Sequence, residues 1–73
     1  MIGGYLIRVT IARDGQAPTR LLYVVAEEDE DRALAYVRTR SRAVQNAAVD
    51  SLGPVTKAEL KRRGAKPGDV VPL

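Results

Sequence analysis

The stretch that decides the fold is YLIRVTIAR, residues 5–13, followed after a short break by TRLLYVVA, residues 19–26. Apolar side chains alternate along the first stretch, and those that point to one side are Tyr5, Ile7, Val9 and Ile11. Alternation with a period of two, rich in β-branched residues, is typical of a half-buried β-strand. Asp14-Gly15 tolerates positive φ angles and favours a turn. The sequence therefore predicts a β-hairpin whose loop closes at Pro18 and is longer than the tightest type.

The second stretch of the hairpin is apolar on both sides. Leu21, Tyr23 and Val25 alternate with Leu22, Val24 and Ala26. A strand of this kind is usually covered on both faces. Because one short helix can cover only one side of a small sheet, the other side needs the C-terminal segment or a partner molecule.

A helix is expected from the acidic run at residues 27–31 to about Gln45. Acidic side chains stabilise the positive end of a helix, and the arginines at 38, 40 and 42 suit its last turns. Asp29 or Glu28 is the expected cap. At 100° per residue, one stripe should lie on the hairpin. Its members are Ala33, Leu34, Val37, Ser41 and Val44.

The remaining sequence predicts a strand, a short helix, a turn and a tail that can add an edge strand. Ala47 to Leu52 reads as a third strand that Gly53-Pro54 ends. Thr56-Lys57-Ala58-Glu59 fits a capping box, so a second helix is expected from Lys57 to Arg63, with Gly64 in the left-handed conformation after it. Lys66-Pro67-Gly68-Asp69 has proline and glycine where a type II turn requires them. Val70 to Leu73 suits an edge strand, where Pro72 is tolerated.

These elements predict a single small α+β domain over residues 1–73. The expected architecture is a three-stranded, mainly antiparallel sheet in ββαβα order, packed on one long helix, with a short second helix and a C-terminal tail. The chain of 73 residues has no cysteine and no histidine, so disulfides and the usual zinc ligands are excluded. Stability must come from packing, from local signals or from a second copy of the chain.

The composition argues against an enzyme and against cofactors or metals. The usual general base and the strongest nucleophile are both missing. Gly3-Gly4 is not followed by a phosphate-binding lysine or a dinucleotide fingerprint. The acidic run lacks the central glycine of a calcium loop. No apolar run is long enough for a membrane span, and residues 1–8 do not resemble a secretory leader, so the cytoplasm is the expected compartment.

Two function hypotheses lead, from different classes. A third, a small enzyme acting through carboxylates, would need a concave pocket that a core of this size can hardly enclose. The first is a non-enzymatic module that pairs with itself or with another protein. Its expected contact surface is Leu6, Leu22 and Val24, unless the tail residues Leu60, Val70, Val71 and Leu73 cover them. The second is nonspecific nucleic-acid binding, since nine basic residues stand against three acidic ones from Arg32 onward. Its expected surface is Arg38, Arg42, Lys61, Arg62 and Arg63.

Overall fold

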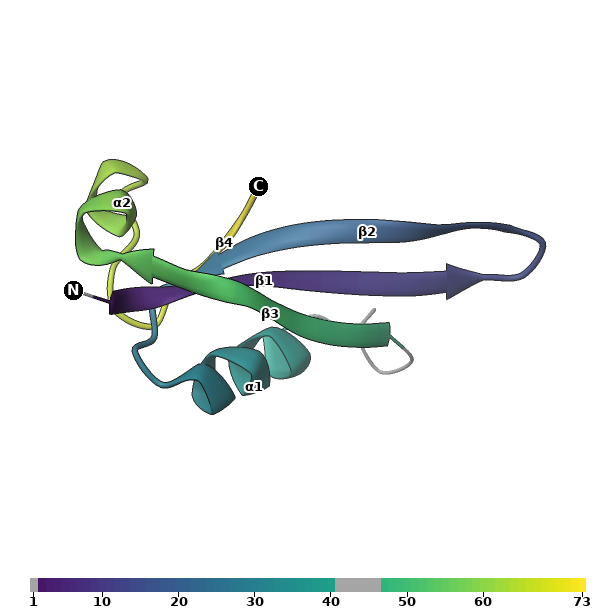
Figure 1. Cartoon of the computed structure of the whole chain (residues 1–73), viewed down its shortest axis with the longest axis horizontal. Coiled ribbons are helices and arrows are strands. Elements are labelled where there is room, and N and C mark those ends of the chain that lie inside the picture. Colours follow the sequence, from purple (N-terminus) through teal and green to yellow (C-terminus); the bar gives the residue numbers. More distant parts are fainter. Residues whose placement is uncertain (1, 41–46) are drawn as a thin grey trace.

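A computed structural model of the chain describes residues 2–40, apart from the Arg40 side chain, and residues 47–73. Its elements in chain order are β1 (Ile2–Arg13), β2 (Gln16–Val25), α1 (Glu30–Arg40), β3 (Ala47–Thr56), α2 (Lys57–Arg62) and β4 (Val70–Pro72). The strands form one antiparallel sheet in the order β3-β1-β2-β4 (Figure 1). The prediction of an α+β fold with an antiparallel sheet and two helices is confirmed.

The predicted number of strands is wrong, because the sheet has four strands rather than three. The tail contributes β4, in which Val70 and Val71 lie opposite Val25 and Val24. The third strand also runs on to Thr56 instead of ending at Gly53-Pro54. Gly53 lies where the β1–β3 register shifts and has a φ of +149°, which favours glycine. Pro54 is accommodated because β3 is an edge strand.

The prediction of one long helix is also wrong, since α1 has 11 residues. Its start is set by Asp29, whose Oδ1 accepts a hydrogen bond from the Arg32 amide at 3.1 Å. Asp29 is therefore the cap, one of the two residues predicted for it, and Glu27 and Glu28 precede the helix and are not part of its first turn. Ala33 and Val37 are buried as the stripe predicts, and Leu34 packs beside them. Ser41, Val44 and Gln45, which complete the predicted stripe and helix, lie outside the described residues.

The hairpin is longer and its turn tighter than expected. Arg13 pairs with Gln16, so only Asp14-Gly15 separates the strands, and Pro18 lies within β2 instead of closing a loop. At the other end β1 includes Gly3 and Gly4. A Cβ on Gly4 would collide with the Val25 carbonyl oxygen. Glycine at this position allows the two strands to approach each other closely.

The two helices pack on opposite faces of the sheet (Figure 1). On one face, α1 buries Ala33 and Val37 against Ile7, Val9 and Val25. On the other face, α2 and the turn after it cover only the end of the sheet nearest the start of β1, where Leu60 packs with Val24 and Ala26. We call this second face, which bears the side chains of Leu6, Arg8, Leu22 and Val24, the far face.

The local signals around α2 are confirmed. The Thr56 side chain accepts a hydrogen bond from the Glu59 amide at 3.2 Å, and Val55 packs against the Leu60 cluster as a hydrophobic staple does. Gly64 follows the helix with a φ of +71°. The next turn closes through the Asp69 amide, which donates to the Lys66 carbonyl at 2.9 Å. Ala26 fastens this turn to the sheet, since its amide donates to the Asp69 carbonyl at 2.9 Å.

Gly4→Ala should destabilise the fold by about 3 kcal/mol or more, because the added methyl group meets backbone and no flexible side chain can move aside. Urea unfolding followed by circular dichroism measures the effect. Ala17→Val is the matched control, since it enlarges an exposed strand position and should change the stability by less than about 0.5 kcal/mol. Equal stabilities of Gly4→Ala and the wild type would show that the close strand approach is not required.

Candidate functional site

The three residues of the predicted interaction surface differ in how far α2 and the tail cover them. Val24 is 2% exposed and belongs to the cluster with Ala26 and Leu60. Leu6 is half-buried and packs against the same cluster. Leu22 lies on the same face of β2 as Val24, two residues further from α2, and is 38% exposed. The tail and α2 therefore cover Val24 and much of Leu6 but leave Leu22 open to solvent.

Leu22 forms an apolar patch with Leu73. The Leu73 amide donates a hydrogen bond to the Leu22 carbonyl at 2.9 Å, so the two residues lie side by side. Leu73 is two residues beyond Val71, which pairs with Val24, and it continues the far face. It is 56% exposed. We call this pair the Leu22–Leu73 patch.

Arg8 lies next to this patch in the sheet. Its register partners are Leu22 on β2 and Asp50 on β3. The guanidinium Nη2 lies 3.4 Å from the Asp50 carboxylate, and both side chains are partly exposed. The Nε atom is buried and has no hydrogen-bond partner within the described part of the chain. A buried donor of this kind is costly unless an acceptor reaches it.

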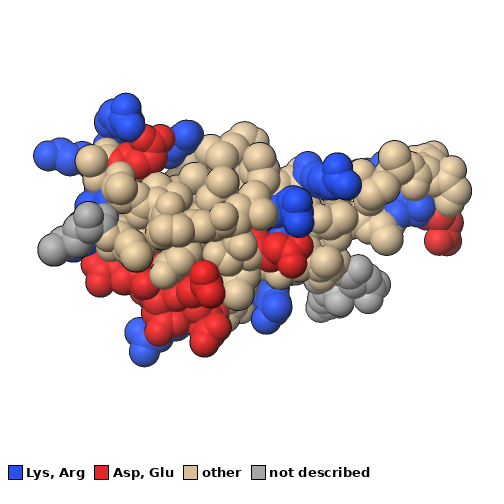
Figure 2. Space-filling view, in the orientation of Figure 1, with Lys and Arg blue, Asp and Glu red and all other residues tan. Residues whose placement is uncertain are grey.

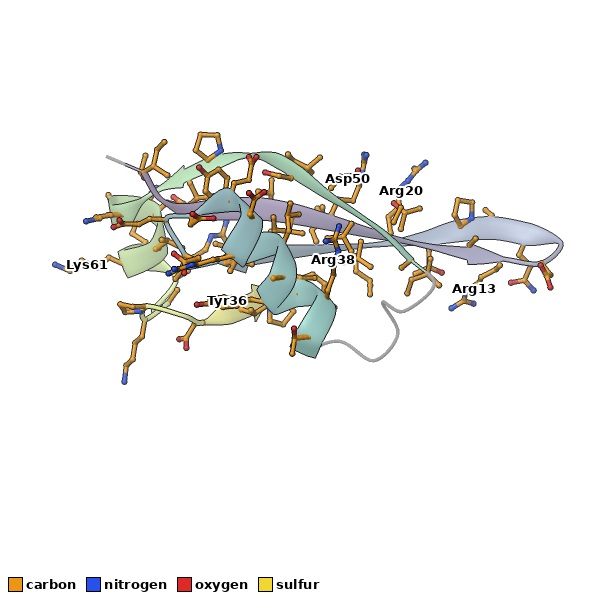
Figure 3. The ribbon with its side chains drawn as sticks, turned by 90° about the horizontal axis from the view of Figure 1, so that it is seen from below. Arg13, Arg20, Tyr36, Arg38, Asp50 and Lys61 are labelled. Atoms are coloured by element: carbon orange, nitrogen blue, oxygen red, sulfur yellow. The ribbon has the colours of Figure 1, made fainter. Side chains whose placement is uncertain are left out.

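The predicted basic surface is not brought together. Arg38 on α1 and Lys61 on α2 lie well apart, because the helices occupy opposite faces of the sheet (Figure 3). Arg62 and Arg63 both form ion pairs with Glu59, the latter at 3.0 Å. Arg42 lies outside the described residues. Nucleic-acid binding stays an untested prediction.

Charge is distributed unevenly over the surface. Acidic side chains gather at the start of α1, whereas basic side chains surround α2 (Figure 2). An ion pair joins the two regions, with the Lys57 Nζ atom 3.2 Å from the Glu28 carboxylate. Residues 28 and 57 are too far apart in the sequence for their pairing to be inferred from spacing.

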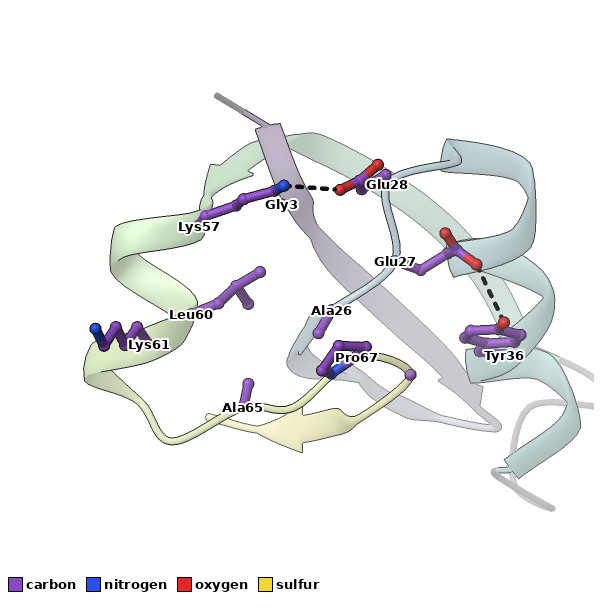
Figure 4. Close-up of a pocket in the computed structure, with 11 residues that line it drawn as sticks. Gly3, Ala26, Glu27, Glu28, Tyr36, Lys57, Leu60, Lys61, Ala65 and Pro67 are labelled. Atoms are coloured by element: carbon purple, nitrogen blue, oxygen red, sulfur yellow. Dashed lines mark hydrogen bonds and ion pairs between the residues drawn. The ribbon is translucent and has the colours of Figure 1, made fainter.

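A groove of about 650 Å³ lies between α2, the turn that follows it and the start of α1 (Figure 4). Its apolar lining includes Ala26, Leu60, Ala65 and Pro67. Gly3 lies in its wall, where a Cβ would come within 2.8 Å of Leu60 Cδ1. Sequence reasoning missed this groove because no motif marks it. The one signal was the glycine pair at residues 3 and 4, whose lack of side chains allows close packing.

Glu27 provides a carboxylate at the groove. Its Oε2 accepts a hydrogen bond from the Asp29 amide at 3.1 Å, and its Oε1 accepts one from the Tyr36 hydroxyl at 3.1 Å. The Asp29 amide and then the Tyr36 hydroxyl hold the pKa of Glu27 below its usual value, because they stabilise the ionised form.

Neither a metal site nor a membrane span emerges from the described ranges, 2–40 and 47–73. They hold no group of three acidic, histidine or cysteine side chains that suits a metal ion, and no helix in them is long and apolar enough to cross a bilayer. Comparisons with protein-family models, with curated proteins and with solved structures find no match.

The lowered pKa of Glu27 predicts a pH-dependent contribution to stability. A carboxyl whose pKa is lower in the folded state stabilises the fold above its unfolded pKa, and this contribution is lost as the pH falls through the folded pKa. Glu27→Gln should therefore melt below the wild type at pH 7 and approach it at pH 2. Asp31→Asn, which removes a neighbouring charge but neither hydrogen bond, is the control. If Glu27→Gln melts below the wild type by the same amount at both pH values, the ionised Glu27 carboxylate is not the cause of the difference in stability.

Proposed function

We propose that this chain is a non-enzymatic protein-interaction module that self-associates through its far face, with the Leu22–Leu73 patch at the centre of the contact. The observation that carries the proposal is the partial cover of that face. Two neighbouring leucines are 38% and 56% exposed beside a core that buries Val24 almost completely. Burying such a patch against a second apolar surface is favourable by roughly 25 cal/mol per Å² of apolar area.

The chemistry around the patch favours a second copy as the partner. Arg8 and Asp50 place opposite charges on the same face, 3.4 Å apart and both partly exposed. A face with both signs of charge is complementary to itself under a two-fold rotation, the symmetry of most homodimers.

The elongated shape of the molecule supports a contact that extends beyond the two leucines. A standard interface hides roughly 800 Å² of each partner. The principal extents are 41 × 18 × 17 Å, and the hairpin projects well beyond both helices (Figure 1). In an antiparallel pair, the projecting end of each hairpin would lie against the sheet of the other copy. This packing adds polar contact area around the central leucines.

Leu22→Lys should weaken self-association by at least about tenfold, because it places a charge in the centre of the apolar contact. Sedimentation equilibrium at micromolar to millimolar concentrations measures the effect against a chain mass of 7.9 kDa. Circular dichroism checks that the variant folds.

Ala35→Lys is the matched control for this experiment. It introduces the same charge at an exposed position of α1, which packs on the opposite face of the sheet. This control substitution should change the association constant by less than about twofold from that of the wild type. A wild type that stays monomeric at millimolar concentration, or an equal loss in both variants, would overturn the proposal.

A further inference from the structure

The groove beside α2 has an apolar floor, and charged side chains line its walls. Ala26 and Leu60 are 8% and 5% exposed, and Ala65 and Pro67 complete the floor (Figure 4). The volume of about 650 Å³ falls in the range of small-molecule sites, which is roughly 300–1,000 Å³. The Leu22–Leu73 patch and this groove are separate, since Leu22 and Leu73 are not part of the lining.

The charged side chains of the groove are not equivalent. Lys57 and Glu28 neutralise each other across one wall, at 3.2 Å. Lys61 extends away from the floor (Figure 4). Glu27 lines the side of the groove next to α1, where Tyr36 and a backbone amide orient its carboxylate through neutral hydrogen bonds (Figure 4). A carboxylate oxygen can accept more than one hydrogen bond, so Glu27 keeps the capacity to receive a further donor.

We propose that this groove binds a small aliphatic cation, with an unbranched alkyl chain on the floor of Ala26, Leu60 and Ala65 and an ammonium or guanidinium group at Glu27. The alkyl chain gains from leaving water, and the charged head gains a charge-assisted hydrogen bond. A head without the chain, or a chain without the head, makes only one of these interactions.

The test uses n-butylguanidinium as the probe, followed by backbone amide chemical shifts of the full chain. Titration should shift the amides of Gly3, Ala26 and Gly68 in a saturable way, while those of Leu22 and Leu73 stay unchanged. Guanidinium alone and pentanol should each bind at least about fivefold more weakly, since each lacks one of the two contacts. No saturable shift with n-butylguanidinium at 20 mM, or equal binding of guanidinium alone, would overturn the proposal.

Two variants and two controls distinguish the contribution of the Glu27 charge to binding from that of the shape of the apolar floor. Glu27→Gln should weaken binding about fivefold, whereas Asp31→Asn and Lys61→Ala should change it by less than about twofold. Ala65→Leu fills the floor and should abolish binding without altering any charge. If Glu27→Gln proves unfolded, Ala65→Leu decides the matter, because undiminished binding by the folded variant would contradict the site. Undiminished binding by a folded Glu27→Gln would contradict it as well.

Discussion

The structure depends on a mismatch in length between its strands and its helices. A helix advances about 1.5 Å per residue and a strand about 3.3 Å. The 11 residues of α1 therefore span roughly 16 Å, whereas the 12 residues of β1 span roughly 40 Å. Neither helix can cover the whole hairpin, and each covers only the part where it packs. The core is confined to that part, and the remaining sheet surface is available for contacts with other molecules.

The covered end shows how a small chain without disulfides gains enough packing. Gly3 and Gly4 bring β1 close to α2 and to β2, and the turn at residues 66–69 is tied to Ala26 through the backbone. This arrangement buries Val24 and Leu60 on the far face while Ile7, Val9 and Val37 are buried on the other face. The same arrangement forms the groove, because α2 packs near Gly3 and the turn is bonded to Ala26, which leaves a hollow between these segments and the start of α1.

Much of the fold follows from local signals, because those signals act within a few residues. The alternation from Tyr5 to Ile11, the Thr56 cap and the Pro67-Gly68 turn each specify structure where they stand. The errors arose where tertiary pairing overrides local preference: Gly3-Gly4 and Gly53-Pro54 lie in strands because a neighbouring strand pairs with them. Of the candidate surfaces, the strand pattern predicts the face on which Leu22 lies, but it does not distinguish the exposed Leu22 from the buried Val24. The groove and the Glu28–Lys57 pair depend on how distant segments meet, which no local pattern encodes.

The proposed contact between two copies of the chain involves the uncovered part of the far face. An isotope-filtered nuclear Overhauser experiment on an equal mixture of labelled and unlabelled chains detects such a contact. Intermolecular contacts from the methyl groups of Leu22 and Leu73 are the predicted result. Their absence at millimolar concentration, together with tumbling expected of a single 7.9 kDa chain, would contradict self-association through this face.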